Sequence, residues 1–174
     1  FGPAAGVGVL AGLGQCHRPV VDIDAVMDGD LFSMLTEMNA DVAAAADKYD
    51  NIEVLFKDAQ NDTLKQRAHV EEFINRGVDL IIISPKESAP LSQPVAKAYN
   101  AGIPVIVLDR ALVGDDFTCF IGADNVMISE AVGRWAVDAL NGEGRVVELK
   151  GLMTSIPAHD RHNGFMKGIE GSDL

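Results

Sequence analysis

The sequence predicts an α/β fold with a parallel sheet, and three observations lead to this class. From residue 51 onward, short apolar runs alternate with amphipathic segments about every 25 to 30 residues, as βα units require. The run VIVL at residues 105–108 has no polar face, so we expect it to be buried on both sides, as strands of parallel sheets are. Glycines follow the amphipathic segments, where the chain must leave a helix.

Five apolar runs are predicted as strands because each is short and rich in branched side chains. They are residues 52–56, 80–84, 105–108, 118–122 and 145–149. Near the start of the chain two segments compete for a further strand, residues 7–13 and residues 20–26. We favour the second, because a turn at Asp28-Gly29 then leads directly into a helix over residues 31–49.

Helices are expected between these strands, and capping residues set their ends. Asn61, Asp62 and Thr63 offer N-terminal caps for a helix that Gly77 ends in the left-handed conformation. The next two helices end in a similar way, at residues 101–102 and 141–142.

The helix that begins near residue 125 is capped by Asp124 or Asn125 and carries one apolar face. That face consists of Val126, Ala131, Val132, Trp135, Ala139 and Leu140. A last helix is predicted over residues 158–170.

Composition describes a globular chain with an excess of acidic side chains. Of the 174 residues, 48% are hydrophobic and 23% are charged, which is typical of a folded protein with a core of ordinary size. The balance of 14 lysines and arginines against 26 acidic residues leaves a formal charge of −12. Such a charge repels phosphate backbones and anionic lipids, so we expect no nucleic-acid partner.

No chemistry of metals, cofactors or catalysis is predicted. Cys16 and Cys119 fit no CxxC pattern. His159 and His162 lie three apart on a predicted helix without an apparent third ligand, which favours a polar helix face over a metal site. The glycines of residues 6–12 follow no strand, which argues against a nucleotide site, and residues 151–157 lack the GxSxG elbow of hydrolases.

Asp109 and Arg110 are the strongest candidates for a binding site. They directly follow the apolar run at residues 105–108, and open α/β sheets bind ligands at the carboxyl ends of their strands. A carboxylate accepts two hydroxyl hydrogen bonds and a guanidinium donates a planar fork, so together they suit the adjacent hydroxyls of a carbohydrate. The alternative is that these two residues merely end a strand. Their position at the carboxyl end of the strand favours a binding site.

Five motifs resemble, in order and spacing, the sugar-binding periplasmic proteins of the ribose and galactofuranose type. They are KDAQND at residues 57–62, INRGVDLIIISP at 74–85, AGIPVIVLDR at 101–110, IGADN at 121–125 and DRHNGF at 160–165. The likeness covers residues 39–170. The same core also serves LacI-type transcriptional regulators.

This resemblance implies the type I periplasmic-binding-protein fold, in which two Rossmann-like lobes with doubly wound parallel sheets are joined by a hinge. We expect residues 1–122 to form the N-terminal lobe without its late-returning strands. Residues 123–174 then form the hinge crossing and a partial C-terminal lobe. Asp124 and Asn125 are expected at the hinge, where short polar residues tolerate changing backbone angles.

The resemblance also implies ligand residues. It supports Asp109 and Arg110, and it places Arg161 as the arginine that the second lobe sends across the cleft. Phe32, or Met34 in another register, lies where the family carries an aromatic residue that stacks on the sugar.

The segment between the first predicted strand and the helix after it leaves two roles open. Asp58, Gln60 and Asn61 can either reach a ligand or cap the helix. We favour the cap, and of the three we keep Gln60 as the ligand candidate.

We therefore predict a solute-binding protein of an ABC-type sugar importer, with a monosaccharide as ligand, a membrane permease as partner, no cofactor and no enzymatic activity. The expected location is periplasmic or extracellular, with a lipid anchor left open. Both ends of the sequence read as cuts, which predicts a fragment. The alternative is the effector-binding core of a LacI-type regulator, which would follow a helix-turn-helix segment and dimerise.

Overall fold

The computed structural model of this chain describes residues 39–174. Its elements follow one another as α2 (Thr63–Arg76), β1 (Ile81–Ile83), α3 (Ser88–Asn100), β2 (Val105–Leu108), β3 (Cys119–Ile121), α4 (Asn125–Ala139) and α5 (Ile156–Gly168). Residues 39–46 are helical as well. The alternation of strands and helices confirms the predicted α/β class.

The three strands form one parallel sheet in the order β1-β2-β3. In its register Ile81 pairs with Val105, and Ile106 pairs with Cys119. Because neighbouring strands run parallel, their carboxyl ends reach the same edge of the sheet, as the prediction for Asp109 and Arg110 requires.

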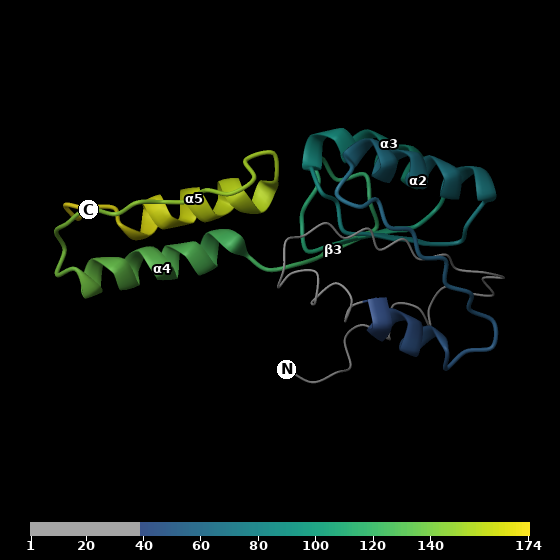
Figure 1. The fold of residues 1–174 in the computed structure, drawn as a ribbon, viewed down its shortest axis with the longest axis horizontal. Coiled ribbons are helices and arrows are strands. Elements are labelled where there is room, and N and C mark those ends of the chain that lie inside the picture. The colour runs from purple at the N-terminus through teal and green to yellow at the C-terminus, as the bar shows by residue number, and fades with distance from the viewer. Residues whose placement is uncertain (1–38) are drawn as a thin grey trace.

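Successive side chains of the strands enter two separate cores, one on each face of the sheet. The larger core combines strand residues with side chains from α2 and α3; its members include Val70, Phe73, Ile81, Ile83, Leu91, Val95, Val105 and Val107. The smaller core consists of Leu80, Ile82 and Ile106, with Val42 and Val54 packed against it. Figure 1 shows α2 and α3 together on one side of the sheet and the helix of residues 39–46 on the other. The sheet is therefore covered on both faces, as predicted from the VIVL run.

Both ends of α2 form as predicted, because their signals are local. Oδ1 of Asp62 accepts the backbone N–H groups of Leu64 at 2.8 Å and Lys65 at 3.1 Å. Gly77 ends the helix with φ 66°, in the left-handed region that favours glycine.

Two predicted strands do not form within residues 39–174. Residues 52–56 and 145–149 join no ladder among the described residues. In the first, Val54 packs on the smaller core and Leu55 on the larger one, so the alternation of a strand is present without its hydrogen bonds. In the second, Val147 is 86% and Leu149 93% exposed. An apolar pattern forms a strand only where a neighbouring strand binds its backbone N–H and C=O groups.

α4 and α5 pack against each other through glycines. A Cβ added at Gly133 would lie 2.7 Å from the Phe165 carbonyl oxygen, and one at Gly164 would overlap the carbonyl oxygen of Val126. Such contacts require the two helix backbones to touch directly.

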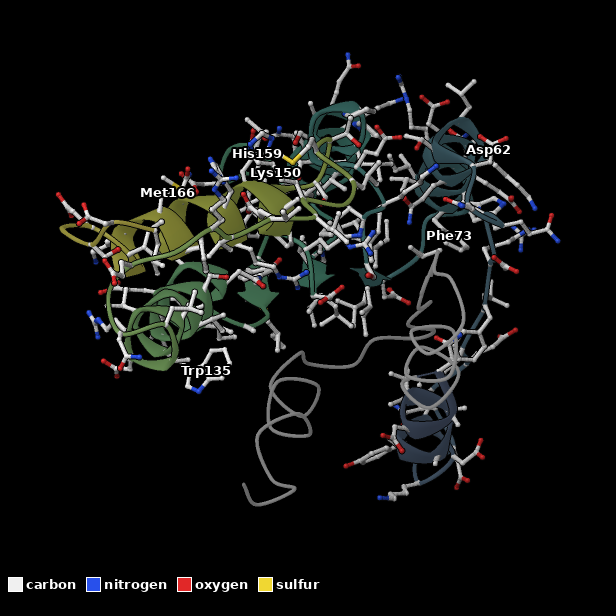
Figure 2. The ribbon with its side chains drawn as sticks, turned by 60° about the vertical axis from the view of Figure 1, so that its left-hand side comes forward. Asp62, Phe73, Trp135, Lys150, His159 and Met166 are labelled. Atoms are coloured by element: carbon white, nitrogen blue, oxygen red, sulfur yellow. The ribbon has the colours of Figure 1, made fainter. Side chains whose placement is uncertain are left out.

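The predicted apolar face of α4 differs from the face that is buried. The buried positions of this helix are Asn125, Ser129, Gly133 and Ala136. Val132 is 50% and Trp135 69% exposed, and Figure 2 shows Trp135 on the side of α4 that faces away from α5. The small residues decide the contact because they allow the closest approach of the helices.

Some predictions fall outside the described residues: the competing strands, the turn at Asp28-Gly29, and Phe32. The helix expected to reach residue 49 ends at residue 46. Within residues 39–174, no helix has both the length and the apolar character needed to cross a bilayer.

Candidate ligand-binding site

A pocket of about 280 Å³ lies where the carboxyl edge of the sheet meets the start of α5. Its walls come from the residues after β2 and from the segment that leads into α5. They are Asp109, Arg110, Lys150, Gly151, Leu152, Ser155, Pro157, Ala158 and Arg161. The pocket thus brings together three of the predicted ligand residues, Asp109, Arg110 and Arg161.

The backbone at Asp109 turns sharply as β2 ends. Asp109 has φ 62°, and the backbone N–H of Arg110 donates to the carbonyl oxygen of Leu108 at 2.6 Å. A three-residue turn with a positive central φ is rare and strained for a non-glycine residue, and such strain concentrates at functional sites. The Asp109 N–H also donates to Ile121 at the end of β3, at 2.9 Å, which fixes the turn against the sheet.

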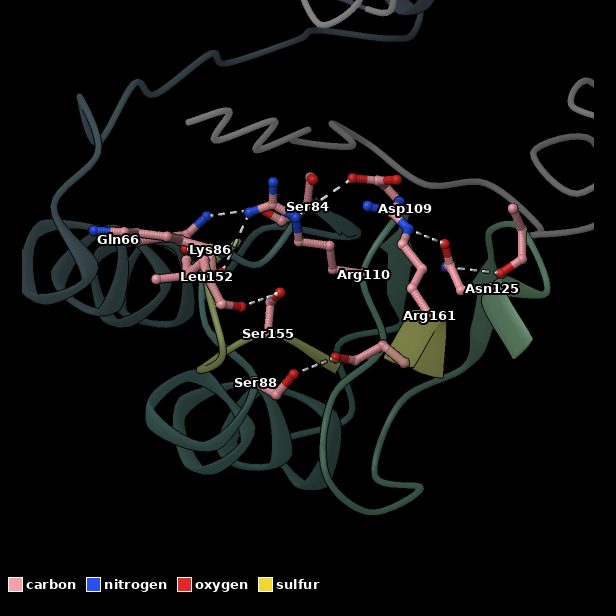
Figure 3. A network of polar contacts seen from close by, with 12 residues as sticks. Gln66, Ser84, Lys86, Ser88, Asp109, Arg110, Asn125, Leu152, Ser155 and Arg161 are labelled. Atoms are coloured by element: carbon pink, nitrogen blue, oxygen red, sulfur yellow. Dashed lines mark hydrogen bonds and ion pairs between the residues drawn. The ribbon is translucent and has the colours of Figure 1, made fainter. Parts of the chain in front are cut away.

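Arg110 is held close to the sheet edge. Its side chain is only 13% exposed; Nε lies 3.6 Å from Oδ2 of Asp109, and Nη1 donates to the carbonyl oxygen of Lys86 at 3.3 Å (Figure 3). Burial lowers the pKa of the Arg110 guanidinium, the Asp109 carboxylate raises it, and the positive charge of Arg161 lowers it further. An arginine stays charged at neutral pH despite such shifts.

Arg161 reaches the pocket from the first half of α5. Its Nε donates to Oδ1 of Asn125 at 2.8 Å, and Nδ2 of Asn125 donates to the carbonyl oxygen of Ala123 at 3.2 Å. Asn125 is 7% exposed. The segment between β3 and α4 is therefore joined by hydrogen bonds to an arginine of the pocket, as Figure 3 shows.

A second set of contacts joins the two sides of the pocket region, at the start of α3. The backbone N–H of Ser88 donates to the carbonyl oxygen of Thr154 at 3.5 Å. The Glu87 carboxylate accepts a hydrogen bond of 2.5 Å from Thr63 Oγ1 and another from the Thr154 side chain. The Thr63 hydrogen bond lowers the pKa of Glu87, burial opposes this, and the Thr154 hydrogen bond lowers it further.

The pocket offers donors in excess and one strong acceptor. Arg110, Arg161 and Lys150 donate only, whereas the Asp109 carboxylate accepts only. Hydroxyl groups, which both donate and accept, can satisfy both kinds of group. Among residues 39–174, no group of three or more His, Cys, Asp and Glu side chains could hold a metal ion.

The structure places the other predicted residues differently. Gln60 is exposed with φ 53° in the turn before α2, where Oε1 accepts a hydrogen bond from Lys65 Nζ at 2.8 Å. It does not line the pocket of Asp109, so its role toward a ligand stays a prediction. Asp124 caps α4, its Oδ1 accepting the Met127 N–H at 2.9 Å. That contact is compatible with the predicted hinge role, which also stays a prediction.

Sequence reasoning missed Lys150 and Ser155 as pocket residues. Residues 151–157 lack a hydrolase motif, but they follow the apolar run at residues 145–149 and so lie at its carboxyl end. The same rule that selected Asp109 selects this loop.

The comparisons with known proteins decide the family. The model of the periplasmic binding protein domain matches residues 28–174. The chain belongs to this family.

Three curated relatives share about a third of their aligned residues with it. The ribose import binding protein of Bacillus subtilis is 33% identical over 114 residues, which are 66% of this chain and 37% of that protein. The xylitol-binding protein of Mycolicibacterium smegmatis is 34% identical over 136 residues, 78% of this chain and 39% of that protein. The galactofuranose-binding protein of Escherichia coli is 33% identical over 117 residues, 65% of this chain and 37% of that protein. The chain thus spans about two fifths of the length of these relatives.

Solved structures agree on the fold. The fructose-binding periplasmic domain of a hybrid two-component system has a TM-score of 0.79 at 40% identity, over 87% of this chain and 49% of that one. A solute-binding protein of an ABC transporter from Bacillus halodurans, with bound myo-inositol, has a TM-score of 0.81 at 30% identity, over 92% of this chain and 55% of that one. The type I periplasmic-binding-protein fold is confirmed, and these relatives do not favour the LacI-type alternative.

Proposed function

We propose that this chain carries part of the cleft in which a periplasmic solute-binding protein holds a monosaccharide or a related polyol. The observation that carries the proposal is the meeting of Asp109 and Arg110, from the end of β2, with Arg161, from α5, around one pocket. Relatives named for ribose, galactofuranose and xylitol support this ligand class.

The pocket suits a ligand of that size and chemistry. Its volume of about 280 Å³ lies just below the roughly 300–1,000 Å³ of typical ligand pockets, as suits a small ligand held in part of a cleft. A hydroxyl donates to the Asp109 carboxylate and accepts from an arginine, so a row of hydroxyls satisfies both kinds of group.

The proposed role is delivery of the sugar to a membrane permease of an ABC-type importer. Binding closes the two sides of the cleft over the ligand, and the permease recognises the closed shape. No bond of the sugar changes in this role, so the protein is not an enzyme. The protein acts in the periplasm or outside the cell, where a lipid anchor would keep it beside the permease.

A second candidate is a sensory domain that binds the same class of ligand. The relative with 40% identity is the fructose-binding periplasmic domain of a hybrid two-component system. In that role closure on the sugar would control a signalling output instead of transport.

Calorimetric titration tests the ligand class. The whole protein is titrated with ribose, arabinose, fructose, galactose, xylitol and myo-inositol, and we expect at least one to bind with a micromolar or lower Kd. Arg110→Lys should weaken that binding about tenfold or more, because lysine cannot donate the planar fork. The matched control is Arg134→Lys in α4, an exposed arginine outside this pocket, which should bind as wild type does.

Two outcomes would contradict the proposal: no binding across the panel, or equal weakening by both substitutions. Deleting the gene separates the two candidate roles. Loss of uptake of the labelled sugar indicates an importer, and loss of a sugar-dependent transcriptional response with uptake intact indicates a sensor.

A further inference from the structure

α2 contains a fully buried polar side chain, Gln66, with 0% of its surface exposed. Its two amide ends contact the loop that leaves β1. Nε2 donates to the carbonyl oxygen of Ser84 at 3.0 Å, and Oε1 accepts the backbone N–H of Lys86 at 3.0 Å. Figure 3 shows this side chain reaching the loop beside Arg110.

An amide is the group that this loop requires. β1 ends at Ile83, so the backbone groups of Ser84 and Lys86 lie beyond the strand. The glutamine offers one donor and one acceptor to a carbonyl and an N–H that would otherwise lose hydrogen bonds on burial. An apolar side chain offers neither, and an ionised carboxylate offers acceptors only.

The same loop also contacts a residue of the pocket, Arg110. The carbonyl of Lys86, the residue whose N–H Gln66 binds, accepts the hydrogen bond from Arg110 Nη1. Gln66 itself does not line the pocket. We infer that Gln66 is a positioning residue for ligand binding: it holds the backbone of Lys86 from its N–H side, and the carbonyl of the same residue in turn orients the Arg110 guanidinium. This inference rests on the proposed function, because it assigns Arg110 to the ligand.

The first test compares two substitutions in the same helix of the whole protein. Gln66→Met keeps the length of the side chain and removes both hydrogen bonds, and we expect the affinity for the bound sugar to fall about five- to tenfold. Val70→Ala is the matched control, because Val70 is equally buried in α2 and its truncation lowers stability without touching the loop. The control should keep its affinity within about twofold of wild type.

A double-mutant cycle shows whether Gln66 acts through Arg110. In an Arg110→Lys background, Gln66→Met should change the affinity by less than about twofold, because no guanidinium remains to be oriented. An equal loss in both backgrounds would overturn the inference, and so would wild-type affinity in the Gln66→Met protein.

A spectroscopic measurement keeps the inference testable if no sugar in the panel binds or if Gln66→Met does not fold. The Nε–H resonance of Arg110, assigned by its disappearance in Arg110→Lys, should shift in Gln66→Glu and stay in place in Val70→Ala. A resonance that is unmoved in Gln66→Glu counts against the inference. Failure of wild type to bind sugar contradicts the proposed function alone.

Discussion

Arg161 donates from α5 to Asn125 at the start of α4, over 2.8 Å between Nε and Oδ1. Asn125 is buried and also binds the carbonyl of Ala123, in the segment that leaves β3. A movement of that segment therefore moves the acceptor that orients Arg161. The relationship connects the predicted hinge to the pocket through a single amide.

Removing the side-chain amide of Asn125 should weaken ligand binding. Asn125→Ala takes away the acceptor for Arg161, and we expect the sugar affinity to fall about fivefold, measured by calorimetry. Asn125→Asp keeps an acceptor at the same place and should lie closer to wild type. Met127→Ala, at a residue of the same helical turn that is 64% exposed, is the control and should leave the affinity unchanged. Equal affinities for the Asn125→Ala and Met127→Ala proteins would refute the relationship.

The close contact of α4 and α5 predicts that an alanine in place of Gly164 lowers stability, the opposite of its usual effect in a helix. In most helix interiors Gly→Ala stabilises by about 0.5–1 kcal/mol, because glycine is the poorer helix former. At Gly164 the new Cβ would overlap the Val126 carbonyl and come within 3.0 Å of Ser129 Cβ. We expect Gly164→Ala to lower the free energy of unfolding by about 1–3 kcal/mol in a urea titration.

Met166→Ala provides the comparison for this helix. Met166 is 49% exposed on α5, so its truncation should change stability by less than about 0.5 kcal/mol. An alanine at 164 that is neutral or stabilising would mean that the helices are farther apart than described.

The lowered pKa of Glu87 predicts that the protein loses stability in acid. Its pKa lies below the ordinary value of 4.5, chiefly because of the hydrogen bond from Thr63. A carboxylate with a lowered folded-state pKa contributes stability that is fully present above its unfolded-state pKa and is lost as the pH falls through the folded-state pKa. Wild type should therefore lose more stability than Glu87→Gln between about pH 6 and pH 3, measured by urea unfolding at each pH. Parallel pH profiles for the two proteins would disprove the contribution of this carboxylate.

Gly77 offers a separate test of helix termination. It adopts φ 66°, and no atom lies within 4 Å of an added Cβ, so an alanine there meets backbone strain alone. We expect Gly77→Ala to cost about 1–2 kcal/mol of unfolding free energy. Gly77→Asn should cost less, because asparagine tolerates the left-handed region. If the two variants were equally stable, backbone strain would not be the reason for glycine at this position.

The parts of the fold that could be predicted from sequence are those fixed by local chemistry. Asp62 and Gly77 marked both ends of α2, and the apolar residues of β1 and β2 showed that these strands are buried on two faces. Residues 145–149 show where prediction from sequence fails. Their apolar pattern is that of a strand, but a strand exists only beside another, and the pattern does not contain its neighbour.

The residues of the candidate site also fall into those that sequence could predict and those that it could not. Asp109 and Arg110 were predictable because the end of a buried parallel strand is a known position for ligands. Arg161 was found only through the resemblance of its motif, since a helical arginine has no local mark of its partner. Gln66 carried no signal at all: a glutamine in a helix is ordinarily exposed, and only the packed structure shows its contacts with Ser84 and Lys86.

The order of the sheet has a consequence for how the chain folds as it is synthesised. β1, β2 and β3 are consecutive in sequence and adjacent in space, so each new strand emerges from the ribosome next to the one just completed. The larger core can therefore close before translation reaches α4. Among the described residues this core uses none beyond Phe117, so its isoleucines and valines are buried early, which shortens the time for which they are open to chaperones and proteases in the nascent chain.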